Sequence, residues 1–421
     1  MAKYLRKIRR RNYVILALFA VIYLCTTMCS PASHSVKTSA PAISDNDGKL
    51  FAGSASCITC HKTIYESHIG TAHYKTSKPA SKEFIKGSFS PGKNHFVYNK
   101  WMEVVLENKG SGYYQTAFMN GAESQSERFD VVIGSGRKGQ TYLYWNNARL
   151  YQLPISYYTP LNDWCNSPGY PSNFIKFTRQ IPSHCIECHG TNAKAEVRPE
   201  EGTVFDKSQI IYGVDCEKCH GPATEHIVYH TAHPGEKTGR YIINARLLDR
   251  QQRLDACALC HSGVRKEIRP AFSFKVGDRL DDFSVPAYNT DSMSTLDVHG
   301  NQYGLLTSSK CFRMSQMDCS SCHNVHVNEV NSPKLFSQRC MTCHYEAAHN
   351  TCTMPPTPGL VLGDNCIDCH MPALPSQKIS LEFSNASKST PDLVRTHRIA
   401  IYSESVKAYL EKVKSKKSSG M

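Results

Sequence analysis

Several patterns that are typical of common protein classes are missing from this sequence. No Cys-x-x-Cys pair occurs without a histidine directly after it, and no third cysteine stands close to such a pair. Iron–sulfur motifs need that third cysteine, and a structural zinc site would not demand the histidine after every pair. Tetratricopeptide repeats are also missing. These absences disfavour zinc, iron–sulfur and helical-repeat proteins.

Long hydrophobic runs are scarce as well. The apolar run at residues 13–24 is shorter than the roughly 20 residues of a membrane-spanning helix, and it follows a basic stretch. We therefore expect an export signal at residues 1–29 and a periplasmic protein, with an uncleaved N-terminal anchor as the alternative. Cys29, followed by a polar linker at residues 30–48, resembles the lipidated cysteine of a bacterial lipoprotein. The other reading is an ordinary signal peptide whose cysteines are incidental.

The pattern that dominates the chain is Cys-x-x-Cys-His, which occurs seven times. We number the copies motif 1 to motif 7, at residues 57–61, 185–189, 216–220, 257–261, 319–323, 340–344 and 366–370. This spacing is typical of covalent haem c attachment, in which both thiols bond to the porphyrin vinyl groups and the histidine binds the iron. The cysteines are Cys57, Cys60, Cys185, Cys188, Cys216, Cys219, Cys257, Cys260, Cys319, Cys322, Cys340, Cys343, Cys366 and Cys369. The expected proximal ligands are His61, His189, His220, His261, His323, His344 and His370. We predict seven haem c groups per chain.

The formal net charge of +13 overstates how basic the working protein is. Six of the positive charges lie in the signal, which leaves +7 on the mature chain. Seven haems would add roughly −14 from their propionates, so the loaded protein is expected to be near neutral or mildly acidic. A nucleic-acid partner is therefore not supported.

The motifs divide the chain unevenly. Motif 1 stands alone in a first haem segment at residues 49–94, and the other six crowd into a domain at residues 181–400. A chain so dense in motifs cannot bury an ordinary side-chain core, so we expect short α-helices and irregular loops around a haem array. An amphipathic helix and basic tail follow at residues 401–421, with Val406, Tyr409, Leu410 and Val413 on one face.

Between motifs 1 and 2 the pattern changes to that of β-strands. Apolar and polar residues alternate from Met102 to Leu106, a turn follows at residues 109–112, and further strand and turn signals continue to about residue 160. We therefore predict a β-rich insertion at residues 95–180 with a β-meander at about 95–160. The glycines Gly134 and Gly136 are expected in a hairpin turn, not in a phosphate loop.

Each haem either has a sixth ligand or leaves that position open. Twelve histidines lie outside the motifs, which allows bis-histidine ligation of every haem but does not require it. The histidines best placed as distal ligands are His73, His226, His299, His326, His349 and His397. Weaker candidates are His68, His95, His230 and His233, of which His230 and His233 share a helical stripe with His226.

Several of these segments resemble the cytochrome c-554 superfamily. The likeness is carried by Phe51-Ala-Gly-Ser-Ala-Ser-Cys57 with His73, by Cys216-Glu-Lys-Cys-His-Gly-Pro with His226, by the segment from Cys319 to His326, and by Cys366-Ile-Asp-Cys-His-Met-Pro with His397. It implies mostly bis-histidine haems in stacked pairs, periplasmic electron transfer, and distal roles for His73, His226, His326 and His397. The chain departs from that pattern in having seven motifs where the namesake has four.

Two classes of function follow from these observations. The first is an exported electron relay that exchanges electrons with other redox proteins or with a membrane quinol-oxidising complex. The alternative is an oxidoreductase of a small nitrogen or sulfur compound, such as nitrite or hydroxylamine, at one open haem. The side chains that could line such a pocket are Arg137, Arg149, Tyr151, Tyr157 and Tyr158, although packing is the simpler role for each. A haem-based sensor or a subunit of a respiratory complex is a third reading.

Three cysteines beyond the signal lie outside the motifs. They are Cys165, Cys311 and Cys352. In an oxidising compartment the simplest arrangement is one disulfide and one buried thiol, and we expect Cys311 to pair with Cys352.

Overall fold

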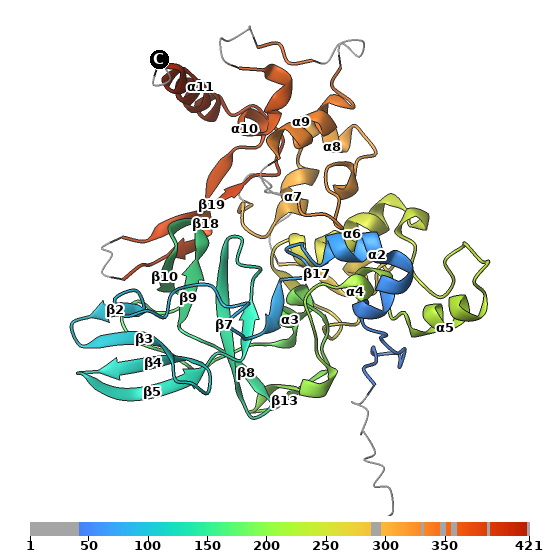
Figure 1. Cartoon of the computed structure of the whole chain (residues 1–421). Coiled ribbons are helices and arrows are strands. Elements are labelled where there is room, and N and C mark those ends of the chain that lie inside the picture. Colours follow the sequence, from blue (N-terminus) through green and yellow to red (C-terminus); the bar gives the residue numbers. More distant parts are fainter. Residues whose placement is uncertain are drawn as a thin grey trace, which may run out of the picture. The chain divides into compact units, whose positions relative to one another are not determined.

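The computed structural model describes residues 42–287, 296–329, 332–345, 351–354, 360–384 and 388–418 (Figure 1). The chain divides into a unit at Met1–Pro41 and a unit at Ala42–Met421, and the described residues belong to the second. The expected signal, Cys29 and the candidate ligand His349 lie outside the described residues.

The segment around motif 1 is helical at first and then extended. A 3₁₀ turn, η1 (Ser54–Cys57), leads into α2 (Ile58–His68), and β1 (Ser77–Pro79) follows. His61, the last residue of motif 1, has non-helical backbone angles and interrupts α2. Motif 1 therefore ends at a kink, beyond which the chain continues for another two turns of helix.

An antiparallel meander comes next, as the alternation of residues predicts. It consists of β2 (His95–Asn99), β3 (Met102–Asn108), β4 (Tyr113–Met119) and β5 (Ala122–Arg128), paired in that order. Met102 pairs with Met119 and Asn108 with Tyr113, which leaves residues 109–112 as the predicted turn. Val104 and Leu106, both fully buried, lie on the same face of β3 because side chains alternate along a strand.

A second sheet contradicts the prediction of one continuous meander over residues 95–160. Its strands are β6 (Val131–Ile133), β7 (Gly139–Asn146), β8 (Arg149–Gln152), β9 (Ile155–Tyr158), β10 (Asp163–Asn166) and β11 (Arg179–Gln180), together with β1. β1 pairs with β6 from outside the predicted insertion, and β11 pairs with β8 from beyond residue 160. Periodicity in the sequence marks strands but does not identify distant partners, so this pairing was not foreseen.

The rest of the chain contains many short helices, as expected for a haem array. They are α3 (Ser183–His189), α4 (Cys216–His220), α5 (Thr224–Ala232), α6 (Arg250–His261), α7 (Gln302–Thr307), α8 (Lys310–Arg313), α9 (Pro333–Met341), α10 (Cys366–His370) and α11 (Ser403–Ser418). Further 3₁₀ turns are η2 (Thr159–Leu161), η3 (Lys207–Gln209), η4 (Ala245–Leu247), η5 (Leu280–Asp282), η7 (Cys319–Ser321) and η9 (Leu362–Asp364). Among the described residues none of these helices is long and apolar enough to cross a membrane.

Small two-stranded sheets occur between these helices, and the sequence did not predict them. The pairs are β12 (Gly190–Asn192) with β15 (Ile211–Tyr212), β13 (Ala195–Arg198) with β14 (Gly202–Phe205), β16 (Arg265–Glu267) with β17 (Ser284–Pro286), and β18 (Ala373–Leu381) with β19 (Thr390–Arg395). The strands of the first three pairs carry too few residues for a period-two pattern to stand out.

The apolar core is concentrated in the β-rich part. Fully or nearly fully buried side chains such as Tyr142, Leu153, Ile155 and Trp164 form its largest cluster. A second cluster extends from strands of this part to Ile186 in motif 2, and the cluster next to motif 4, built on Ala258, Phe274 and Leu280, is much smaller. A side-chain core that is sparse where the motifs are dense is what a fold built around prosthetic groups requires.

Candidate haem sites

Each motif lies at a helical turn, which brings its two cysteines together. Residues three apart in a helix share one face, so both thiols of a Cys-x-x-Cys pair can reach one porphyrin. Motifs 2, 3 and 7 coincide with α3, α4 and α10, and motif 4 forms the C-terminal end of α6. Motif 5 begins on η7, and motif 6 begins at the end of α9.

Acidic residues directly before two of the motifs fix where these turns begin. Asp215 accepts a hydrogen bond from the backbone N–H of Cys216, and Asp318 accepts from the N–H groups of Ser320 and Ser321. Side-chain oxygens at this position satisfy backbone donors that have no partner inside the helix. Asp318 is also buried, so this helix cap places a desolvated carboxylate beside Cys319.

Three motif histidines present one ring nitrogen to an oxygen and leave the other available. Nδ1 of His220 lies 2.8 Å from the carbonyl of Ile243, and Nδ1 of His370 lies 3.0 Å from that of Ala400. Nδ1 of His189 lies 2.9 Å from Oγ1 of Thr76. Metal-binding histidines commonly donate from one nitrogen in this way, which orients the ring and leaves Nε2 for the metal.

Three predicted distal histidines lie opposite motif histidines at a repeated distance. His73 and His261 have ring centroids 6.2 Å apart, and so have His220 and His326. The rings of His323 and His397 are also 6.2 Å apart.

This repeated distance fits a metal ion between the rings. Two imidazoles that bind one metal from opposite sides, each through a nitrogen about 2 Å away, have centroids about 6 Å apart. The residues present therefore fit bis-histidine haem iron at motifs 3, 4 and 5. The ring planes of His220 and His326 differ by 13°, and those of His73 and His261 by 73°.

Burial favours the neutral form of five of these imidazoles. Desolvation lowers the pKa of His73 to about 4 and that of His397 to about 4. The pKa values of His261, His323 and His326 are lowered for the same reason. A neutral imidazole is the form that binds a metal ion, so the burial suits ligation.

Two further predicted ligands have other neighbours. Nδ1 of His226 contacts the carbonyl of Arg240 at 2.8 Å, and its ring lies 4.6 Å from that of His230, too close for the pair to flank one iron. Nδ1 of His299 lies 3.6 Å from Oδ2 of Asp392. In both residues Nε2 is the nitrogen left for a metal.

His68, which the sequence ranked low, is more deeply placed than expected. It is buried, its ring centroid lies 6.1 Å from that of His326, and its Nδ1 is a buried atom with no hydrogen-bond partner within the described part of the chain. Nothing in the sequence beyond its place at the end of α2 pointed to it. Nδ1 of His95, another weak candidate, lies 2.9 Å from Oε2 of Glu103 at the surface.

The three tyrosines among the five side chains considered for an open polar pocket are engaged elsewhere. The hydroxyl of Tyr158 donates to Asp392 at 2.8 Å, and that of Tyr157 donates to Asn162. The ring of Tyr151 stacks on that of Tyr144. These contacts agree with the packing role that the sequence favoured for them.

The expected disulfide is wrong. Cys311 and Cys352 are both free thiols, and Cys165 is free and buried in the β-rich part. Of the predicted disulfide and buried thiol, only the buried thiol, Cys165, is therefore present. Spacing along the chain does not report whether two Cβ atoms approach closely enough for a bridge.

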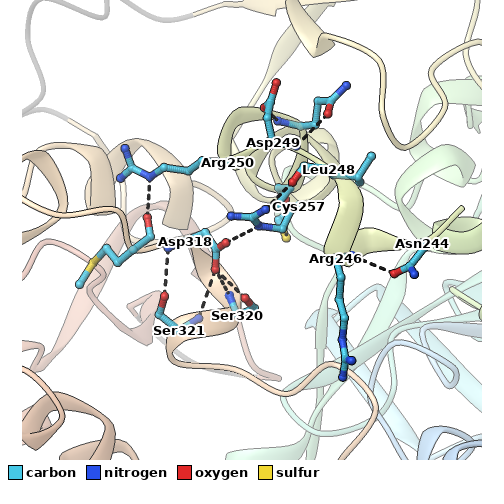
Figure 2. Close-up of polar contacts among 12 residues, drawn as sticks. Asn244, Arg246, Leu248, Asp249, Arg250, Cys257, Asp318, Ser320 and Ser321 are labelled. Atoms are coloured by element: carbon cyan, nitrogen blue, oxygen red, sulfur yellow. Dashed lines mark hydrogen bonds and ion pairs between the residues drawn. The ribbon is translucent and has the colours of Figure 1, made fainter.

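Charged side chains that link one motif to another were missed by the sequence reasoning. Nε of Arg253, one turn before Cys257 on α6, donates to Oδ2 of Asp318 at 2.6 Å. Arg250 donates to the carbonyl of Met317 at 2.9 Å. Figure 2 shows Asp318 facing the helix that carries Cys257. The only signal in the sequence was the acidic residue next to the first cysteine of a motif, which does not reveal its partner.

Two comparisons of sequence point to one class of protein. Residues 172–221, which contain motifs 2 and 3, match the family described as cytochrome c554 and c-prime. Multiheme cytochrome MtrA of Shewanella baltica (strain OS185) is 23% identical over 181 residues, which cover 38% of this chain and 52% of that protein. The matched region thus spans about half the length of that relative. Together with the histidine geometry, these matches support a multihaem cytochrome c, an electron-transfer class with covalently bound haem c.

A solved structure shares the fold. The crystal structure of outer cell wall cytochrome OcwA matches with a TM-score of 0.52 at 15% sequence identity. The match covers 85% of this chain and 81% of OcwA. At this level of identity the likeness concerns the fold alone, and it extends over most of the chain, including parts outside the cytochrome c554 match.

Proposed function

We propose that this chain is an exported electron relay with one haem c at each of its seven motifs, most of them bis-histidine ligated. Haem iron supplies a reversible one-electron change, and two histidine ligands favour fast exchange because the coordination hardly changes. With haem bound, each transfer would move one electron from an Fe(II) to a neighbouring Fe(III), and no bond would form or break.

The observation that carries this proposal is the 6.2 Å spacing of three histidine pairs. We assign His73 as the distal ligand at motif 4, His326 at motif 3 and His397 at motif 5. His226, His299 and His349 remain proposed ligands for other motifs. Every assigned pair joins segments remote in sequence, as expected when haems tie the fold together.

Export, attachment and partners belong to the same proposal. The basic and apolar pattern at residues 1–24 supports an export signal, and Cys29 is the proposed site of a lipid anchor. Export would bring the thiols to the compartment where haem c is attached. The electron partners are then other redox proteins or a membrane quinol-oxidising complex.

Low-temperature EPR of the oxidised protein tests the proposal, with total haem measured on the same sample. We expect low-spin signals from nearly all the iron and one haem for each motif. A high-spin signal from one haem that shifts when nitrite or hydroxylamine is added would instead indicate catalysis at an open site. A haem content well below one per motif would refute the proposed loading.

A further inference from the structure

Polar contacts link motif 1 to motif 3. The buried carboxylate of Glu217, inside motif 3, accepts from the backbone N–H of Ala52 and of Gly53, each at 2.8 Å. It accepts a third hydrogen bond from the N–H of Ala223 at 2.8 Å. The chain leading into motif 1 is therefore held against motif 3.

A second contact links motif 2 to motif 4. Sγ of Cys188 lies 3.7 Å from the carbonyl oxygen of Leu259, which stands between the two cysteines of motif 4. Glu187, also in motif 2, accepts from the N–H of Phe272 beyond motif 4. These two motifs are thus adjacent although residues 190–256 separate them.

Motifs 6 and 7 form a third pair. The backbone N–H of Cys366 donates to Oγ of Ser337 at 2.9 Å, and Ser337 is fully buried on α9, which leads into motif 6. Asn365 beside motif 7 in turn donates to the hydroxyl of Tyr409 on α11 at 2.7 Å. The C-terminal helix therefore lies next to motif 7.

Motif 5 contacts all three pairs. Asp318, directly before it, binds Arg253 on the helix of motif 4 (Figure 2). His326, three residues after it, faces His220 of motif 3 with ring centroids 6.2 Å apart. On the other side the carbonyl of Cys322 accepts from Arg339, which directly precedes motif 6. Arg339 also pairs with Glu329 just beyond motif 5.

We propose that motif 5 is the junction of the relay, so that electrons exchanged between motifs 1–4 and motifs 6–7 pass through the haem that it holds. The inference rests on the proposed function, because it requires haem at every motif. Motifs 1–4 are already in mutual contact through the pairs above and through His73 and His261, so the junction matters for exchange with motifs 6 and 7.

Voltammetry of the oriented holoprotein tests the junction. A polyhistidine tag at the C-terminus, next to motif 7, attaches the protein to an electrode, which serves as the one-electron donor. The test variant carries Cys319→Ser and Cys322→Ser and lacks the haem of motif 5. At fast scan rates we expect the charge measured for this variant to correspond to the haems of motifs 6 and 7 only. The charge measured for the wild type should correspond to every haem.

The matched control carries Cys185→Ser and Cys188→Ser, which removes the haem of motif 2 instead. It should pass charge for all its remaining haems at the same scan rate. The junction is refuted if the motif 5 variant does so too. Haem counted on each sample separates this outcome from failure of the proposed function, which would appear as unloaded motifs in the wild type.

A second variant covers the case in which the double substitution does not fold. His397→Met keeps the haem of motif 5 but exchanges its assigned distal ligand and raises its potential. We expect an unchanged haem content and a several-fold slower exchange of charge with motifs 1–4, while motifs 6 and 7 respond as in the wild type. Equal rates for all haems would refute the junction.

Discussion

Arg253 and Asp318 join two haem motifs across 65 residues of sequence. Nε of the arginine lies 2.6 Å from Oδ2 of the carboxylate, and the side chain of Asp318 is 8% exposed while that of Arg253 is 32% exposed. Burial alone would raise the pKa of Asp318, but hydrogen bonds from Ser320 and Arg253 outweigh it and lower that pKa. The contact sets α6 of motif 4 against η7 of motif 5.

Replacing this arginine is expected to destabilise the protein. Removing one partner of a buried ion pair costs roughly 3–5 kcal/mol, and partial exposure of Arg253 reduces our expectation for Arg253→Met to about 1–3 kcal/mol. Denaturant unfolding of the holoprotein, followed by haem absorbance, measures the loss. The control is Arg279→Ala, whose partner Asp249 and own side chain are both about half exposed. If both variants lose the same stability, Arg253 has no special role.

Removal of an assigned distal histidine should change the spin state of one haem. His397→Ala leaves an iron with one histidine, so we expect one low-spin EPR signal to be replaced by a high-spin signal. His95→Ala is the matched control, because His95 lies at the surface and contacts the carboxylate of Glu103 there. An unchanged spectrum of the His397 variant would show that another group binds that iron.

The carboxylate of Glu217 should be needed to hold the segment before motif 1. In Glu217→Gln one acceptor oxygen becomes an NH₂ donor that faces a backbone N–H, and leaving a buried donor unpaired costs about 1–3 kcal/mol. We expect faster proteolysis near residue 52 and a lower unfolding midpoint. Glu196→Gln serves as control, since Glu196 lies on an exposed strand and pairs only with Arg198. Equal behaviour of the two variants would contradict the bridging role.

Acidification should weaken the contact between motifs 5 and 6. The hydrogen bond from Arg339 lowers the pKa of Glu329 from its ordinary value of 4.5. A carboxyl whose folded pKa is lowered stabilises the fold above its unfolded pKa and stops doing so as pH falls through the folded pKa. Glu329→Gln should therefore be less stable than the wild type by about 1–2 kcal/mol near neutral pH and equally stable in acid. A difference that persists in acid would exclude this ionisation as the cause.

The cysteines outside the motifs should differ sharply in reactivity. Burial raises the pKa of Cys165 to about 12, and its side chain is 1% exposed. We expect maleimide to label Cys352, which is exposed, and to label Cys165 only after unfolding. Peptide mapping without reductant identifies the labelled sites. A bridged Cys311–Cys352 peptide would restore the disulfide that the structure contradicts.

Local features of the fold followed well from the sequence. The turn between β3 and β4, the strands on either side of it and α11 all arise from patterns within a few residues. The division of strands into two sheets did not, because β1 reaches β6 from the other side of the meander. The small sheet of β18 and β19 was also missed, since its pairing is irregular and β18 does not alternate regularly between apolar and polar residues.

The sequence by itself determined the chemistry of attachment, because two thiols and a histidine within five residues already form the unit that takes haem c. It also narrowed the proposed distal ligands to a short group of histidines. Only the tertiary structure decided which histidine faces which motif, as with His73 opposite His261 and His397 opposite His323. The same holds for the place of motif 5 between the other motifs. Those relationships depend on contacts between segments far apart in the chain, and a linear spacing carries no information about them.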